Sequence, residues 1–134
     1  MNQIHPDVSL TPILTRITAF GNMHYHLYSN ALTVDRSNVL GDFTECSSAG
    51  YALVAVAPGD WATDSLVAHN ASRSAPDIAF TASSGSYTAN GYYITDSADA
   101  VLLGCATFPS TVTIDPSNPL ILTPKWGDVS KFSS

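Results

Sequence analysis

Charged side chains are scarce in this sequence: 11 acidic and five basic residues stand among 134, about 12% of the chain. An ordinary soluble domain carries roughly 25%. The few basic residues are scattered, and the net charge is −6, so no patch can follow a phosphate backbone and we expect no nucleic-acid partner. Ser, Thr, Asn and backbone must hydrate the surface instead. Such a surface favours contact with copies of itself or with a larger partner.

Long hydrophobic runs are also lacking. No apolar stretch approaches the roughly 20 residues that cross a bilayer, and we expect no membrane partner. Residues 1–6 have neither basic residues nor an apolar core, so we expect no signal peptide and synthesis in the cytoplasm. Cys46 and Cys105 lack the spacing of a zinc site. They could pair, because distant strands of a sandwich often meet, but two reduced and buried thiols are the simpler interpretation.

What the sequence does contain is short alternating segments between turn residues. In 23–28, Met23, Tyr25 and Leu27 share one face of an expected strand, and the histidines share the other. The apolar run 51–57 suggests a central strand covered on both sides. Further strands are expected at 77–82, 86–89, 92–95, 100–108, 111–114 and 120–123.

Turn signals separate these strands. Asn90-Gly91 is the strongest, and predicts a tight hairpin turn; residues 83–85 predict another. Residues 96–99, Pro109-Ser110 and 115–119 are expected to be turns as well. The spacing of about 10 residues predicts an all-β fold, an antiparallel β-sandwich or jelly roll of about eight strands.

Helical signal is confined to one place. Residues 37–46 could form at most one short helix, capped by Ser37, although Gly41 interrupts it. The length predicts a single domain spanning 1–134. Residues 1–12 and 127–134 are expected to be terminal arms, which could reach a neighbouring subunit or simply fray.

Few groupings of residues point to chemistry. His24 and His26 could hold one metal ion, with His5 or His69 joining them, but without a placed carboxylate they form a weak site. Two histidines on a solvent-facing or interface surface, paired with hydroxyls, are the expected arrangement. We therefore expect no metal and no cofactor.

Carboxylates could in principle supply acid–base catalysis. Asp42 and Glu45 stand three residues apart, as do Asp96 and Asp99, and paired carboxylates hydrolyse glycosides. Asp42, Asp96 and Asp99 are better explained as turn residues, because Asp side chains accept bonds from nearby backbone N–H groups. No nucleophile motif or phosphate-binding loop occurs either. The sequence predicts a protein without enzymatic activity.

Aromatic residues give the candidate interface. If they are exposed on a β-sandwich, aromatic side chains could stack on sugar rings or anchor a protein interface. Alternatively, they could simply pack in the core or at an edge. Counting the two histidines, the interface candidates are Trp61, Trp126, Tyr28, Tyr92, Tyr93, His24 and His26.

Four segments have a familiar pattern: 27–30 (LYSN), 40–45 (LGDFTE), 49–51 (AGY) and 90–96 (NGYYITD). Together they resemble small proteins encoded among the virion genes of tailed bacteriophages. The resemblance implies a virion component, and within that group a capsid cement (decoration) protein: a compact β-sandwich or jelly roll that sits as a trimer on the major capsid protein. It also allows a tail, baseplate or fibre component. It transfers no catalytic residue.

Overall fold

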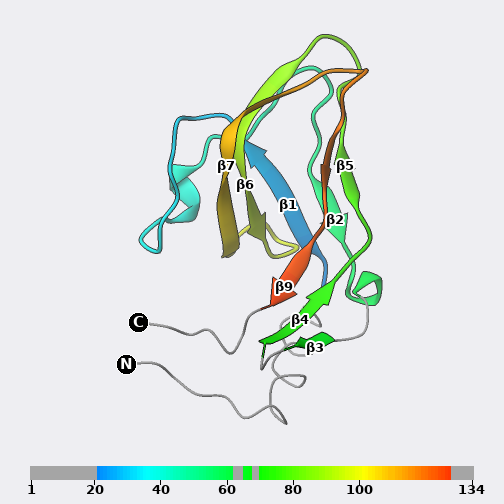
Figure 1. Ribbon diagram of the computed structural model, residues 1–134. Helices are drawn as coiled ribbons and strands as arrows, with labels where there is room; N and C mark the ends of the chain where they lie inside the picture. Colours follow the sequence, from blue (N-terminus) through cyan, green and yellow to red (C-terminus); the bar gives the residue numbers. More distant parts are fainter. Residues whose placement is uncertain (1–20, 62–64, 68–69, 128–134) are drawn as a thin grey trace. The chain divides into compact units, whose positions relative to one another are not determined.

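Antiparallel β-structure dominates the computed structural model, which describes residues 21–61, 65–67 and 70–127 (Figure 1). The chain divides into two compact units, each built from separate segments. The larger contains Asn22–Val56 and Ile78–Leu122, and the described part of the smaller contains Gly21, residues 57–77 except the gaps, and 123–127. The prediction of an all-β fold is confirmed.

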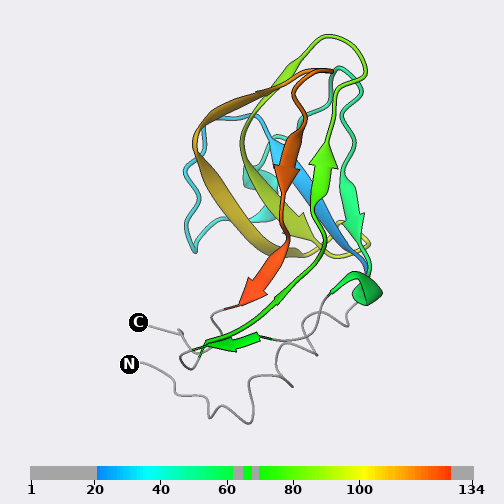
Figure 2. The same ribbon diagram turned by 45° about the vertical axis from the view of Figure 1, so that its right-hand side comes forward.

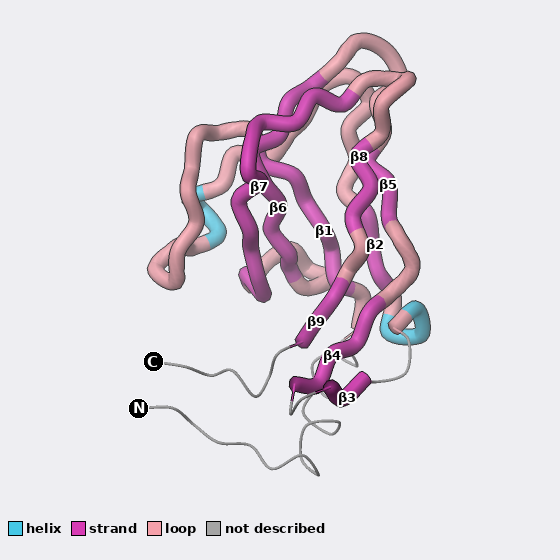
Figure 3. The backbone as a smooth tube through the Cα atoms, viewed as in Figure 1, coloured by secondary structure: helices cyan, strands magenta, loops and turns pink. Residues whose placement is uncertain are grey.

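The larger unit is built on a four-stranded sheet of order β2-β1-β6-β7. Its strands are β1 (Met23–Tyr28), β2 (Val54–Val56), β6 (Tyr87–Thr95) and β7 (Leu102–Ile114). All three pairings are antiparallel, and β6 with β7 forms a long curved hairpin (Figure 2). A separate pair, β5 (Ile78–Phe80) with β8 (Leu120–Leu122), makes a second antiparallel sheet (Figure 3).

The core of the larger unit lies around β1. Met23, Tyr25 and Leu27 are buried, as the alternation predicts, but so are His26 and Tyr28 on the opposite face. Burying one large apolar side chain contributes roughly 1.5–3 kcal/mol. The largest side chains of this core that are less than 2% exposed are Met23, Leu27, Tyr28, Val56, Phe80, Thr95 and Ile114.

An aromatic contact joins the two sheets of this unit. The ring of Tyr51 stacks on Phe80 of β5 at 6.2 Å between centroids and meets Tyr87 of β6 edge-on at 5.6 Å. Such aromatic pairs contribute about 0.5–1.5 kcal/mol beyond the area they bury. Residues before β2 therefore help to hold β5 against the main sheet.

The smaller unit has a three-stranded antiparallel sheet of order β3-β4-β9. The strands are β3 (Ser65–Val67), β4 (Asn70–Ser74) and β9 (Lys125–Gly127). A single 3-10 turn, Pro58–Asp60, begins with proline and is closed by the Asp60 carboxylate, which accepts the Ala57 N–H at 2.9 Å. Trp61 follows it and is buried.

The prediction of a hairpin turn at Asn90-Gly91 is wrong. Both residues lie inside β6, at a register shift between Ala89 and Gly91. Glycine is needed there for space: a Cβ at position 91 would lie 2.4 Å from the Tyr28 hydroxyl and 2.2 Å from the Ala106 carbonyl oxygen. The Asn90 amide meanwhile donates to the carbonyls of Ser29 and Asn30 at 2.8 and 3.0 Å.

Three other predictions fail because strand pairing is not local. The run 51–57 yields only β2, an edge strand rather than a central one. Residues 83–85 join strands of different sheets, so they make no hairpin. Pro109-Ser110 does not end a strand: both residues lie within β7, opposite the register shift in β6.

Other local predictions are confirmed. Residues 96–99 and 115–119 do turn the chain, and in each turn the first Asp accepts backbone N–H groups. The 37–46 segment contains only the 3-10 turn Leu40–Asp42, which begins after Val39 rather than at Ser37. The expected arms 1–12 and 127–134 lie outside the described residues, except for Gly127, which ends β9.

Candidate functional site

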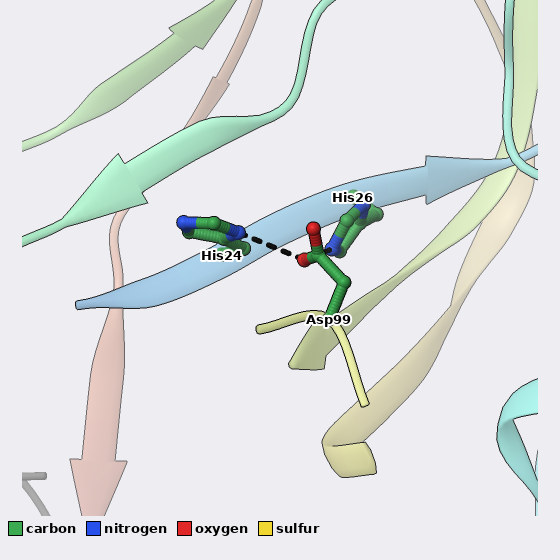
Figure 4. Close-up of side chains that lie close together, drawn as sticks. All are labelled: His24, His26 and Asp99. Atoms are coloured by element: carbon green, nitrogen blue, oxygen red, sulfur yellow. Dashed lines mark hydrogen bonds and ion pairs between the residues drawn. The ribbon is translucent and has the colours of Figure 1, made fainter. Parts of the chain in front are cut away.

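Two histidines and a carboxylate come together beside β1 (Figure 4). His24 and His26 point to the same side because alternate residues of a strand share a face. His26 is only 3% exposed, whereas His24 is half-buried. The prediction that the histidines share a face is confirmed. The expectation that they lie on a solvent-facing or interface surface is wrong for His26, because this chain itself covers the ring.

Asp99 reaches the histidines from the turn between β6 and β7. The carboxylate of Asp96 fixes this turn by accepting the N–H groups of Ala100 and Val101 at 2.8 and 3.2 Å. Asp99 itself has a φ of +55°, in the left-handed region that Asp tolerates better than most residues. Because His24 pairs with Thr95 at the end of β6, the turn that follows lies next to the histidine face.

A single oxygen of Asp99 makes three contacts. Oδ1 lies 2.8 Å from His24 Nδ1, 3.2 Å from His26 Nε2 and 2.8 Å from the Thr95 hydroxyl. The Thr95 hydroxyl is also 2.8 Å from His26 Nε2. One nitrogen from each of the two imidazoles and one carboxylate oxygen lie within 4.8 Å of one another.

Glu45 holds the other side of His26. Its Oε2 accepts a hydrogen bond from His26 Nδ1 at 2.6 Å and another from the Tyr51 hydroxyl at 2.7 Å. The Tyr51 oxygen in turn accepts the backbone N–H of Leu27 at 3.0 Å. This chain of hydrogen bonds fixes the plane and the depth of the His26 ring.

Aromatic packing completes the site. The His26 ring lies parallel to Tyr93, with centroids 4.6 Å apart, and Phe43 stacks on the far side of Tyr93 at 4.6 Å. His26 and Asp99 line a cleft of about 190 Å³ with Leu40, Leu53 and Tyr93. The imidazole is therefore held rigidly at the edge of a small cavity.

The surroundings shift the pKa of several groups. Partial burial of Asp99 raises its pKa, but hydrogen bonds from His24 and Thr95 and the charge of both histidines outweigh this, and its net pKa is lowered. Burial, and then the carboxylates of Glu45 and Asp99, raise the pKa of Tyr93 to about 12. Burial also raises the pKa of Tyr51. Both phenols therefore stay neutral near pH 7, while the lowered pKa keeps the Asp99 carboxylate ionised.

Sequence reasoning missed Asp99 and Glu45 as partners of the histidines. It placed Asp99 in the turn, which is confirmed, without placing that turn next to β1. The pairing of β1 with β6 places that turn beside the histidines. Because Asn90-Gly91 was interpreted as a turn, β6 was predicted as two separate strands and this pairing was missed. Of the four carboxylates considered for catalysis, Asp42 and Asp96 accept N–H groups of their own turns, whereas Glu45 and Asp99 line the same cleft on either side of His26.

Most interface candidates are covered by the chain itself. Tyr28, Tyr93 and His26 are buried, and Trp61 is buried as well. His24 and Tyr92 are half-buried, and Tyr92 stacks against Tyr25 with centroids 6.0 Å apart. Trp126 lies on β9, and its side chain is outside the described part of the chain. Their contact with a partner stays a prediction.

A different surface is open to solvent and has no charged side chain on its strand. Strand β7 lies at the edge of its sheet and contains no charged residue in 13 positions. Leu103 on β7 is 36% exposed, Val101 just before it 52%, and Val39 61%. Beside Leu102–Cys105 lies a groove of about 540 Å³, whose other wall includes Val34, Asp35, Arg36 and Asn38.

The cysteines are both free: Cys46 is buried, and Cys105 on β7 is half-buried. Burial and then the nearby Glu45 charge raise the pKa of Cys46 to about 11. Its thiol donates to the Thr88 carbonyl at 3.3 Å. The interpretation of both as unpaired agrees with the structure, whereas the expectation that both are buried is wrong for Cys105.

The described residues include no helix with the length and hydropathy that a membrane crossing requires. No family model matches the chain, and searches of curated proteins and of solved structures found no significant match.

Proposed function

We propose that this chain is a non-enzymatic structural protein of a bacteriophage virion, a cement protein that binds the major capsid protein on the outer shell. In this proposal it acts as a trimer, and the two sheets of its larger unit form a β-sandwich of the jelly-roll kind. Each copy contributes modest affinity, and the symmetry of the shell multiplies it. A location in the tail, baseplate or fibre is the alternative.

The open edge of β7 is the observation that supports this proposal best. Exposed edge strands offer unpaired N–H and C=O groups to other chains, and proteins that remain monomeric usually protect such edges with charges or coverings. Strand β7 has 13 residues, no charge and an exposed Leu103. Burying this apolar surface against another protein would contribute about 25 cal/mol per Å².

The use of the carboxylates supports the same conclusion. Five of the eight described acidic residues accept backbone or side-chain hydrogen bonds inside turns, namely Asp35, Asp42, Asp60, Asp96 and Asp115. Two more, Glu45 and Asp99, contact histidines. These few acidic side chains are engaged by groups of the chain itself, even where they lie at the surface, and none of them stands on β7.

Cryo-electron microscopy of the virion that the chain belongs to is the direct test. Density for the chain at the junctions of major capsid proteins, in groups of three, is the expected result. Density at the tail or baseplate would replace the cement role with the alternative. Absence of the chain from purified virions would contradict both roles.

A pair of variants tests the surface. Leu103→Lys places a charge on the β7 surface, and we expect it to lower capsid occupancy and the oligomer mass measured by light scattering. Ile121→Lys is the matched control, because Ile121 is an equally apolar and 51% exposed residue on β8. Equal effects of the two variants, or none from either, would remove β7 as the contact surface.

A further inference from the structure

We propose that His24, His26 and Asp99 bind one divalent transition-metal ion of the zinc class, with Glu45 positioning His26. The ion would join β1 to the turn between β6 and β7. This inference is independent of the virion role, because it depends on side chains beside β1 and not on the β7 surface.

The distances fit a tetrahedral ion. Zinc bonds of about 2.0–2.1 Å place two ligand atoms roughly 3.3 Å apart. The Asp99 oxygen lies 2.8 Å from His24 Nδ1 and 3.2 Å from His26 Nε2, so both separations need to change by no more than a few tenths of an ångström. The two imidazole nitrogens are within 4.8 Å of each other. Closing a tetrahedral site would therefore require the His24 nitrogen to move toward His26 by up to about 1.5 Å.

The carboxylate of Glu45 is the kind of hydrogen-bond partner that metal-bound histidines have. A metal-bound histidine almost always donates its other ring N–H to a carboxylate or carbonyl, which fixes its orientation and strengthens its basicity. Glu45 accepts the Nδ1–H of His26 at 2.6 Å, and Tyr51 donates to the same oxygen. The Nε2 lone pair is thereby directed toward Asp99.

The donor set selects the kind of ion. Two imidazoles and a carboxylate suit zinc, cobalt and related ions, while magnesium and calcium prefer oxygen ligands. Three protein ligands leave one position for water. That position opens on the cleft that His26 and Asp99 line.

The test uses the full chain after EDTA treatment and desalting, titrated with Zn²⁺ by calorimetry and with Co²⁺ by visible absorption. We expect one ion per chain, cobalt bands of tetrahedral intensity, and a higher Tm with Zn²⁺ but not with Mg²⁺. His24→Asn and Asp99→Asn should weaken zinc binding by about a hundredfold. Glu45→Gln should weaken it by about 10–100-fold.

Two features of this design separate a metal site from a set of hydrogen bonds. His24→Asn keeps an N–H donor for Asp99 but removes the imidazole ligand, and Asp42→Asn removes a carboxylate that contacts only its own turn. We expect Asp42→Asn to bind like the parent chain. No zinc binding at 100-fold excess over the protein, or equal binding by the parent and His24→Asn, would overturn the proposal. The parent titration remains decisive if a variant fails to fold.

Discussion

Strands β1 and β7 belong to the same sheet and use their side chains in opposite ways. On β1 two histidines meet Glu45, Asp99 and Thr95 through hydrogen bonds of 2.6–3.2 Å, behind stacked aromatic rings. Strand β7 has no charged side chain and faces outward over much of its length. The comparison teaches that one strand of the sheet carries polar contacts that depend on exact geometry, whereas the edge strand presents an uncharged surface of hydroxyl and apolar side chains.

Gly91→Ala should have the largest effect, because it lies where β1, β6 and β7 approach most closely. The new Cβ would stand 2.4 Å from the Tyr28 hydroxyl and 2.2 Å from the Ala106 oxygen. We expect a loss of about 3 kcal/mol in the free energy of unfolding, measured with urea. Gly41→Ala is the control, since nothing lies within 4 Å of its Cβ. Equal stabilities of the two variants would show that the three strands are not packed in this way.

His26→Ala should have the next largest effect. It removes a buried ring that stacks on Tyr93 and leaves Glu45 and Thr95 without their imidazole partner. We expect a loss of roughly 2–3 kcal/mol in EDTA, and less than about 1 kcal/mol for the more exposed His24→Ala. If His24→Ala proved the more harmful, the buried side of the cluster would not be the stabilising one.

Asp115→Asn tests a charge at the end of β7. The side chain of Asn118 and the backbone N–H of Ser117 hold the pKa of Asp115 below its usual range. A carboxylate whose pKa is lower in the folded chain stabilises it above pH of about 4, and the benefit disappears as the pH falls through the folded pKa.

Chemical denaturation across pH should therefore show the parent more stable than Asp115→Asn near pH 7, with the difference disappearing in acid. Ser117→Ala lies in the same turn and has no titratable group, so its effect should not change with pH. A constant difference for Asp115→Asn would mean that the charge plays no part in this turn.

The smallest effect is a difference in thiol reactivity between the two regions. Cys46 is buried with its pKa raised to about 11, whereas Cys105 on β7 is half-buried. Because the thiolate is the reactive form, iodoacetamide at pH 8 should label Cys105 at least about tenfold faster, as read by mass spectrometry. Labelling in denaturant should equalise the two, and faster labelling of Cys46 in the native chain would contradict its burial.

Local features could be predicted from the sequence. The strand at 23–28, the shared face of His24 and His26, and the turns at 96–99 and 115–119 follow from alternation and from the preference of Asp for backbone N–H groups. These properties depend on neighbours in the chain. The all-β class follows from their sum.

Long-range features could not be predicted from the sequence. Asn90-Gly91 has the local signal of a hairpin turn, but the glycine serves the close approach of the Tyr28 ring, and the Asn side chain ties β6 to Ser29 and Asn30. The cluster depends on the pairing of β1 with β6, which brings residues about 75 positions apart into contact. Alternation along one strand holds no information about which strand lies beside it.

The uncharged edge of β7 has a consequence for the solution conditions under which the chain can assemble. Contacts between ionised groups weaken as added salt screens them, but β7 itself has no charge to be screened. Sulfate and other excluded salts strengthen apolar burial, and cooling weakens it. Assembly through β7 would therefore persist at high ionic strength and weaken as the temperature is lowered.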